Sequence, residues 1–172
     1  LTAWDYLMHL GYGARDVIVA GDSAGGNLAL ELTLKLKESG RFLPGRLVLF
    51  SPWTDLTASG ASYQSARELD PMLTMNYIQA VRSAYAPQTD WSDPHLSPLF
   101  ADLHGFPPTL IRVGEREILR DDSTALAQKL REAEVPCVIR TWPDMWHVFQ
   151  MFPLKSASEA MEHVADFLQR YD

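Results

Sequence analysis

Cysteine is scarce in this chain: Cys137 is the single one among 172 residues. One thiol cannot form an internal disulfide or a cysteine-based metal cluster, so we expect a protein of a reducing compartment, the cytoplasm. Cys137 lies in an apolar segment that is typical of a strand, and its side chain is expected to be a small buried filler. No other cluster of metal ligands stands out, so neither a metal nor an organic cofactor is expected.

Long apolar runs and an excess of positive charge are also missing. The apolar run from Leu47 to Phe50 is far too short to span a bilayer. The chain has 15 Lys and Arg residues against 22 Asp and Glu residues, which gives a net charge of −7. Without a basic stripe to neutralise phosphates, nucleic acids and anionic membranes are not expected partners.

The composition is that of one globular domain. Hydrophobic residues make up 47% of the chain and charged residues 22%, without internal repeats or a low-complexity linker. Residues 1–7 begin directly in an amphipathic helical pattern, with neither an initiator methionine nor a basic targeting segment. We therefore expect residues 1–172 to be the C-terminal portion of a single, longer catalytic domain.

Strand and helix patterns alternate along the chain, which predicts an α/β fold with a parallel sheet and helices on both of its faces. The run after Arg46 is entirely apolar, as in a strand buried on both faces. The helix that follows residue 23 has Leu28, Leu32 and Leu36 at four-residue spacing, an apolar stripe. The predicted strands are 17–20, 46–51, 109–113 and 138–142, and the predicted helices are 2–10, 24–38, 75–85, 122–133 and 157–170.

A Gly-x-Ser-x-Gly pattern at residues 21–25 lies between a predicted strand and a predicted helix. In this setting the pattern indicates a nucleophile elbow, in which Ser23 has a strained backbone and an exposed hydroxyl. Small residues are expected to be required at positions Gly21 and Gly25, because a larger residue there would collide with the tight turn. The alternative is a glycine-rich turn that holds a phosphate, but there is no Gly-Lys-Ser/Thr ending and no acidic partner in a second strand.

A nucleophilic serine needs a base, and the base needs an acid that fixes its tautomer. Glu117 follows the predicted strand at 109–113, and His147 follows the predicted strand at 138–142. Because the carboxyl ends of parallel strands meet at one sheet edge, both residues should lie on the same edge as Ser23. The order serine, acid, histidine is the one found in α/β-hydrolases.

Each of these roles has rivals. For the acid, Glu115 reads better as a solvated loop charge, and Asp121 and Asp122 read better as helix caps, with Asp121 the next choice after Glu117. The other histidines lie on predicted helices (His9 and His163) or in loops without a preceding strand (His95 and His104), and they are expected to be ordinary surface or packing residues.

Seven segments together resemble the hormone-sensitive-lipase family of α/β-hydrolase esterases. They are GDSAGG at 21–26, SPWTDL at 51–56, DPML at 70–73, SPL at 97–99, PPTLIRVG at 107–114, EILRDDS at 117–123 and WPDMWHVF at 142–149. The resemblance runs across nearly the whole chain. It implies a carboxylesterase or lipase-like hydrolase with Ser23 as the nucleophile, His147 as the base and Glu117 as the acid. It also implies esters with short- to medium-chain acyl groups.

One departure from the family pattern is serious. The family has a His-Gly-Gly-Gly segment upstream of the elbow that makes most of the oxyanion hole, and an N-terminal cap that shapes the pocket; this sequence contains neither. The backbone N–H of Ala24 is then the single oxyanion donor that this chain can supply. Loss of one such donor lowers the rate by about a hundredfold to a thousandfold, so the chain by itself is expected to be a weak enzyme or none.

Aromatic and flexible side chains near the strand ends are candidates for the substrate pocket, with core packing as the alternative for about half of them. They are Trp53, Met72, Trp91, Met145, Trp146 and Phe149. The expected partners are a small ester substrate and the missing N-terminal part of the same domain, with a homodimer as a further candidate assembly along the open sheet edge.

Three other functions compete with the esterase hypothesis. A serine peptidase of the prolyl-oligopeptidase type shares the fold and the elbow, but it would be expected to have aspartate as the acid and no Ser-Pro-Trp-Thr-Asp run. A small-molecule receptor on the same scaffold typically lacks the catalytic histidine, whereas His147 is present. An assembly module that folds only with its missing half is compatible with the esterase hypothesis.

Overall fold

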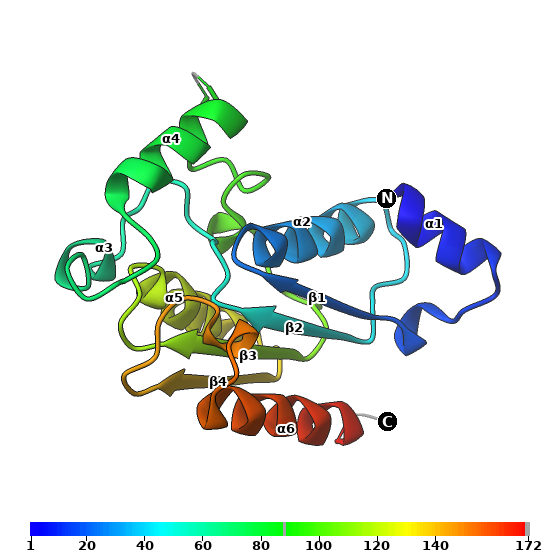
Figure 1. Ribbon diagram of the computed structural model, residues 1–172. Coiled ribbons are helices and arrows are strands. Elements are labelled where there is room, and N and C mark those ends of the chain that lie inside the picture. Colours follow the sequence, from blue (N-terminus) through cyan, green and yellow to red (C-terminus); the bar gives the residue numbers. More distant parts are fainter. Residues whose placement is uncertain (88, 171–172) are drawn as a thin grey trace.

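The computed structural model describes residues 1–87 and 89–170. Its centre is a four-stranded parallel sheet in the order β1-β2-β3-β4 (Figure 1). Neighbouring strands are in register over their full apolar lengths, with Ala20 beside Val48 and Ile111 beside Ile139. All four carboxyl ends therefore meet at one edge. The strands are β1 (Ile18–Asp22), β2 (Arg46–Phe50), β3 (Thr109–Gly114) and β4 (Cys137–Trp142).

Helices cover both faces of the sheet, as predicted. On one face, α2 (Ala24–Glu38) and α5 (Arg120–Glu132) pack their leucines against the side chains of β2 and β3. On the other face, Val164 and Phe167 of α6 (Lys155–Gln169) pack against those strands. β2 is buried on both faces over almost its whole length, which explains its uninterrupted apolar sequence.

The remaining elements lie in the connections. The long segment between β2 and β3 contains α3 and α4, which project beyond the carboxyl edge of the sheet, while α1 lies near the C-terminal end of α2 (Figure 1). These elements are α1 (Thr2–His9), α3 (Ser62–Ser65), α4 (Met75–Tyr85) and the 3₁₀ turns η1 (Ala14–Asp16), η2 (Pro98–Phe100) and η3 (Phe149–Met151).

The apolar stripe expected on α2 is wrong. Leu28 is 58% exposed, whereas Leu36 is fully buried. Three residues at four-residue spacing span about 80° around a helix of 3.6 residues per turn, so Leu28 lies at one end of this arc, outside the buried face, and Leu36 lies at the other end, within it. The buried face is formed instead by Leu30, Leu34 and their neighbours, which pack against β2.

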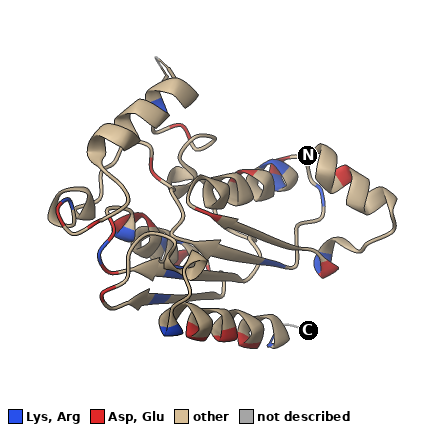
Figure 2. Ribbon diagram, viewed as in Figure 1, with Lys and Arg blue, Asp and Glu red and all other residues tan. Residues whose placement is uncertain are grey.

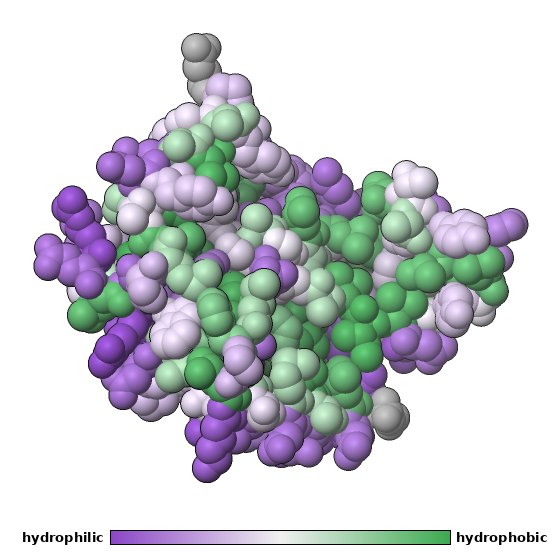
Figure 3. Space-filling view, viewed as in Figure 1, coloured by the Kyte–Doolittle hydropathy of each residue, from purple (hydrophilic) through white to green (hydrophobic). Residues whose placement is uncertain are grey.

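β1 is an edge strand of the described sheet, and apolar side chains gather near it. The space-filling view shows them over β1 and beside α1 (Figure 3). Residues of this region with large exposed apolar side chains are Leu1, Tyr6, Leu10, Tyr12, Ile18 and Leu28. Figure 2 shows positions of both charge signs scattered over the ribbon, with several acidic positions along α6. Among the described residues, no helix combines the length and the apolar character needed to cross a membrane.

Candidate active site

Ser23 lies between β1 and α2, at the carboxyl edge of the sheet. Its backbone has φ 52° and ψ −118°, which L-residues rarely adopt. The turn is held on both sides, because the Ser23 N–H donates to the Phe50 carbonyl (2.9 Å) and the Ser23 carbonyl accepts from the Trp53 N–H (3.0 Å). The strained strand-to-helix turn predicted for Ser23 is confirmed.

Two glycines make this turn possible, although one of them is not the one expected. A Cβ at Gly21 would lie 2.1 Å from the Gly25 carbonyl oxygen, and a Cβ at Gly26 would lie 2.7 Å from the Cβ of Pro52. A Cβ at Gly25 would meet only Asp22 Oδ1, at an ordinary 3.7 Å. The steric requirement predicted for Gly25 is therefore wrong: it belongs to Gly26, which packs against the chain after β2.

The first amide of α2 is placed to bind negative charge. Ser23 is the N-cap residue and Ala24 is the first residue of the helix. The N–H groups of Gly26 and Asn27 donate to the Ser23 carbonyl (3.1 and 3.3 Å), whereas the first N–H groups of a helix have no acceptor within it. The Ala24 N–H, next to the serine, is thus available to a developing oxyanion at the positive end of the helix dipole.

Glu117 lies in the loop after β3, and its side chain is fully buried. Its Oε1 accepts hydrogen bonds from Ser51 Oγ (2.7 Å) and from the Gly114 N–H (2.6 Å). Its Oε2 lies 2.8 Å from Nδ1 of His147. Three partners thus satisfy both oxygens of one buried carboxylate, as the burial of a charge requires.

His147 lies in the loop after β4 and is only 4% exposed. Because an ionised carboxylate only accepts hydrogen bonds, Nδ1 carries the proton and Nε2 is left as an acceptor. The next residue, Val148, has φ 47° and ψ 44°, a left-handed conformation that is unusual for a β-branched residue. The Arg116 N–H donates to the Met145 carbonyl (2.9 Å), which ties the histidine loop to the acid loop.

A short path of hydrogen bonds joins Ser23 to the pair formed by Glu117 and His147. The Ser23 N–H donates a hydrogen bond to the carbonyl of Phe50. Ser51, the residue after Phe50, donates through its hydroxyl to Glu117 and accepts from the N–H of Val148 (3.2 Å). The structure thus gathers the three residues predicted from strand-end positions at one sheet edge, with the acid and the histidine in direct contact.

The rival acids have other partners. Asp121 accepts from the Ser62 N–H (2.8 Å) and from Arg120 Nε (3.1 Å). Asp122 accepts from the N–H groups of Thr54 and Asp55. The prediction that either aspartate caps the helix is wrong: α5 begins at Arg120 with Leu119 as its N-cap, and both aspartates lie inside its first turn, where negative charge is also favoured.

The other histidines have neighbours away from this edge of the sheet. The ring of His104 contacts Asp102, that of His95 lies near Glu31 and Glu38, and that of His163 lies beside Arg140. His9 is the last residue of α1. His147 is thus the histidine that the structure places in contact with Glu117.

Comparisons with known proteins agree with this geometry. A family model described as the alpha/beta hydrolase fold matches residues 2–151. A crystal structure of an esterase from the bacterial hormone-sensitive lipase family is 34% identical in sequence, with a TM-score of 0.95 over 98% of this chain and 58% of that one. The chain belongs to the hormone-sensitive-lipase family of α/β-hydrolases.

Curated relatives include an esterase of Acinetobacter venetianus, 38% identical over 96% of this chain, and an acetyl-hydrolase of Streptomyces hygroscopicus, 35% identical over 98% of it. The chain covers 56% and 57% of the length of these two relatives. The relatives are therefore much longer than the segment they share with it.

The segment after β2, which supported the family resemblance, packs against the elbow. The buried amide of Asn27, from the first turns of α2, donates to the carbonyls of Trp53 (3.0 Å) and Leu96 (2.9 Å). These bonds hold two loop segments, far apart in sequence, against the helix that begins at Ser23. In this hormone-sensitive-lipase-family chain the Asn27 side chain thus fixes the loops that pack against the first turns of α2, next to the elbow.

The six side chains predicted to line the pocket divide into two groups. Phe149 is fully buried against Trp142, and Trp53 is buried in the apolar cluster beneath α3 and α4. Their placement is that of core residues, because packing leaves them almost no surface to offer a substrate. Met72 is 46% exposed. Trp91, Met145 and Trp146 are half-buried.

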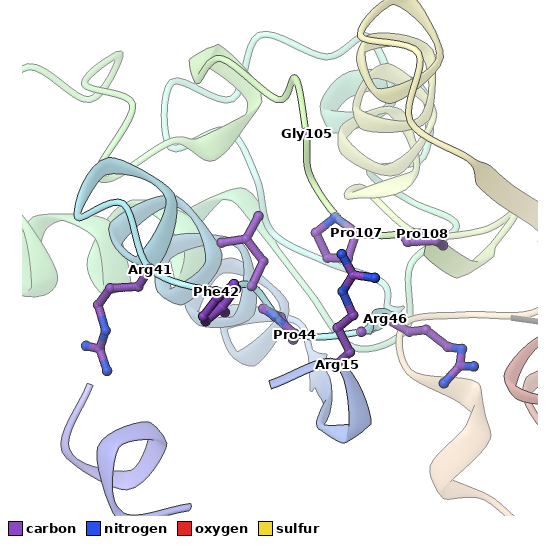
Figure 4. Close-up of a pocket in the computed structure, with 10 residues that line it drawn as sticks. Arg15, Arg41, Phe42, Pro44, Arg46, Gly105, Pro107 and Pro108 are labelled. Atoms are coloured by element: carbon purple, nitrogen blue, oxygen red, sulfur yellow. The ribbon is translucent and has the colours of Figure 1, made fainter. Parts of the chain in front are cut away.

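Two further features lie apart from this site. A hollow of about 500 Å³ is found at the opposite, amino-terminal end of the strands, where Arg15, Arg46 and Pro107 are among its lining residues (Figure 4). It is therefore not a substrate pocket for Ser23.

Cys137 is half-buried against the core, and burial raises the pKa of its thiol to about 11. Among the described residues, no group of side chains is arranged to hold a metal ion.

Sequence reasoning missed Ser51. It follows β2 directly, so it occupies the same strand-end position in its loop as Ser23 does after β1. It is fully buried, and its φ of 48° is again in the left-handed region. A serine at the carboxyl end of an apolar central strand was the available signal. Its contact with Glu117 could not be foreseen, because it joins residues that are 66 positions apart in the sequence.

Proposed function

We propose that this chain contains the catalytic centre of a carboxylic ester hydrolase, with Ser23 as nucleophile, His147 as general base and Glu117 as the acid that orients it. The observation that supports this most strongly is the 2.8 Å contact between the buried Glu117 and Nδ1 of His147, at the same sheet edge as the strained Ser23. A receptor on this scaffold would have no need of such a pair. Glutamate in place of aspartate favours an esterase over a peptidase of the prolyl-oligopeptidase type.

The proposed reaction is two-step acyl transfer. Nε2 of His147 takes the proton of Ser23 Oγ while the oxygen attacks the ester carbonyl. The C–O bond to the alcohol then breaks, and the imidazolium returns its proton to the departing alkoxide. Water attacks the acyl-enzyme in the same way, with His147 again as base, and releases the acid. Throughout, Glu117 stabilises the imidazolium and keeps Nε2 directed toward the reacting atoms.

The Ala24 N–H is the donor that this chain offers to the tetrahedral oxyanion. One donor in place of a full set lowers turnover by about a hundredfold to a thousandfold for each that is absent. We propose that the remaining donors come from a longer form of this domain, of which residues 1–172 are the C-terminal portion. The exposed apolar residues at the edge strand β1 support this, since such an edge is normally covered.

The proposed substrates are esters with short- to medium-chain acyl groups. The Streptomyces relative is named an acetyl-hydrolase, which supports short acyl chains. Met72, Trp91, Met145 and Trp146 are proposed to contact the substrate, because their side chains are partly exposed. Localisation in the cytoplasm stays a prediction from the single cysteine, and a homodimer stays a prediction as well.

Hydrolysis of p-nitrophenyl acetate, butyrate and decanoate by the 172-residue chain and by its Ser23→Ala variant tests the proposal. We expect slow turnover that depends on Ser23 and decreases with the longest acyl chain. Equal rates for the two proteins with all three esters would contradict it.

A further inference from the structure

The buried hydroxyl of Ser51 bridges the two loops that hold the acid and the histidine. Its Oγ lies 2.7 Å from Oε1 of Glu117 and 3.2 Å from the N–H of Val148, the residue after His147. Ser51 itself follows β2, between the strands that precede Ser23 and Glu117. One side chain thus connects the loops after β2, β3 and β4.

The direction of these hydrogen bonds follows from the groups present. A carboxylate can only accept, so the single O–H proton of Ser51 points to Glu117. A backbone N–H can only donate, so a lone pair of the same oxygen accepts from Val148. The hydroxyl therefore uses both of its functions, and alanine or glycine at this position can replace neither.

The backbone of Ser51 is held in an unfavourable conformation while it makes these contacts. Its φ is 48°, and its N–H donates to the Arg112 carbonyl (2.8 Å). A non-glycine residue in the left-handed region is strained, and it stays there only because the surrounding contacts offset the strain. Glycine would adopt this φ without strain, so the serine is explained by its side chain and not by the turn.

We propose that Ser51 is a positioning residue for the Glu117–His147 pair, an inference that rests on the proposed function. Its hydroxyl fixes the carboxylate rotamer through Oε1, so that Oε2 faces Nδ1 of His147. Through Val148 it also fixes the backbone that follows the imidazole. Ser51 touches neither the substrate nor the proton that moves, and it acts on the reaction only through the geometry of its two neighbours.

Two replacements separate this role from a purely structural one. Ser51→Ala removes the hydroxyl and keeps the strained backbone, whereas Ser51→Gly removes the hydroxyl and relieves the strain. Ser97→Ala is the matched control: Ser97 is also fully buried, donates to the Trp91 carbonyl (2.5 Å) and accepts from the Leu56 N–H (2.8 Å), and neither partner adjoins Glu117 or His147 in the sequence.

The first measurement is the steady-state hydrolysis of p-nitrophenyl butyrate as a function of pH. A hydrogen bond to a charged group accounts for about a tenfold to a hundredfold in rate, so kcat should fall by that factor in both Ser51 variants with KM nearly unchanged. Without the Ser51 hydroxyl, the negative charge of Glu117 is less well stabilised, and the Glu117–His147 pair binds a proton more readily. The acid limb of the kcat/KM profile should therefore move to higher pH. Ser97→Ala should leave that limb in place.

The second measurement does not depend on catalysis. The proton on Nδ1 of His147 should give a far-downfield ¹H NMR signal, identified by its loss in Glu117→Gln. We expect this signal to shift or broaden in both Ser51 variants and to stay unchanged in Ser97→Ala. An unchanged signal in both Ser51 variants, or a wild-type kcat and pH profile in them, would overturn the positioning role. A signal that responds to Ser51 in a protein without Ser23-dependent hydrolysis would instead support the positioning role and contradict the proposed function.

Discussion

Glu117 and His147 form a buried pair, with Oε2 of the carboxylate 2.8 Å from Nδ1 of the imidazole. The pair is assembled from the loops after two neighbouring strands, β3 and β4. Because the carboxylate can only accept, it fixes the histidine tautomer and leaves Nε2 as the base. The predictions below follow from this pair and from the strained turn at Ser23.

Replacement of the nucleophile should abolish most of the activity. Ser23→Ala is expected to lower kcat for p-nitrophenyl butyrate by roughly a millionfold in a fully active form of the enzyme, or to background in a weak one. Ser39→Ala is the control, because Ser39 caps the other end of α2 and is exposed. Near-wild-type turnover by Ser23→Ala would show that another residue is the nucleophile.

Replacement of the acid should separate Glu117 from Asp121. Glu117→Gln keeps the shape of the side chain but can present an amide N–H₂ to Nδ1, which favours the wrong tautomer; kcat should fall by about ten-thousandfold. Asp121→Asn should have a much smaller effect, since Asp121 bonds to Ser62 and Arg120. A larger loss of kcat in Asp121→Asn than in Glu117→Gln would assign the acid to Asp121.

The two glycines after the serine should respond in opposite ways to an added methyl group. Gly26→Ala places a Cβ 2.7 Å from the Cβ of Pro52, so we expect destabilisation by about 1–3 kcal/mol. Gly25→Ala meets nothing closer than 3.7 Å and raises helix propensity, so the free energy of unfolding should be unchanged or slightly higher. Urea denaturation of both variants measures the difference, and equal destabilisation would contradict the structure of the turn.

Asp122 should make the stability of the fold depend on pH. Burial raises the pKa of this carboxyl to about 8, and its Oδ1 has no hydrogen-bond partner among the described residues. In the unfolded chain an aspartate has a pKa of about 4, so between these values the folded state binds more protons and the free energy of unfolding falls as pH rises.

Asp122→Asn imitates the protonated carboxyl and should remove this dependence. Relative to wild type, the variant should gain stability on the order of a few kcal/mol between about pH 5 and pH 8.5, measured by urea denaturation. Asp121→Asn, at the neighbouring position, provides the comparison. Parallel stability curves for wild type and Asp122→Asn would contradict a raised pKa at this position.

Much of the fold could be predicted from local patterns. The bounds predicted for the helices at 24–38 and 75–85 are those of α2 and α4, because glycine, threonine and serine mark their ends. The predicted strand at 17–20 is too short by two residues at its end, since Gly21 and Asp22 have weak strand propensity but pair with Leu49 and Phe50. Such pairing is a tertiary effect that a single strand cannot reveal.

The site residues that could be predicted are those that follow a predicted strand. Ser23, Glu117 and His147 each follow a predicted strand, and parallel topology then brings them to one edge. Ser51 escaped notice because its role depends on a hydrogen bond across the fold. Phe149 was misjudged because an aromatic residue near the histidine looks the same in sequence whether it faces a substrate or Trp142.

The central claim is that His147 and Glu117 make Ser23 nucleophilic. The most direct test is the rate at which a p-nitrophenyl alkylphosphonate labels the chain, followed by mass spectrometry of peptides. The account predicts one adduct, on Ser23, formed at a rate that falls at least a hundredfold in His147→Ala. No adduct on Ser23, or an adduct that forms equally fast without His147, would contradict it.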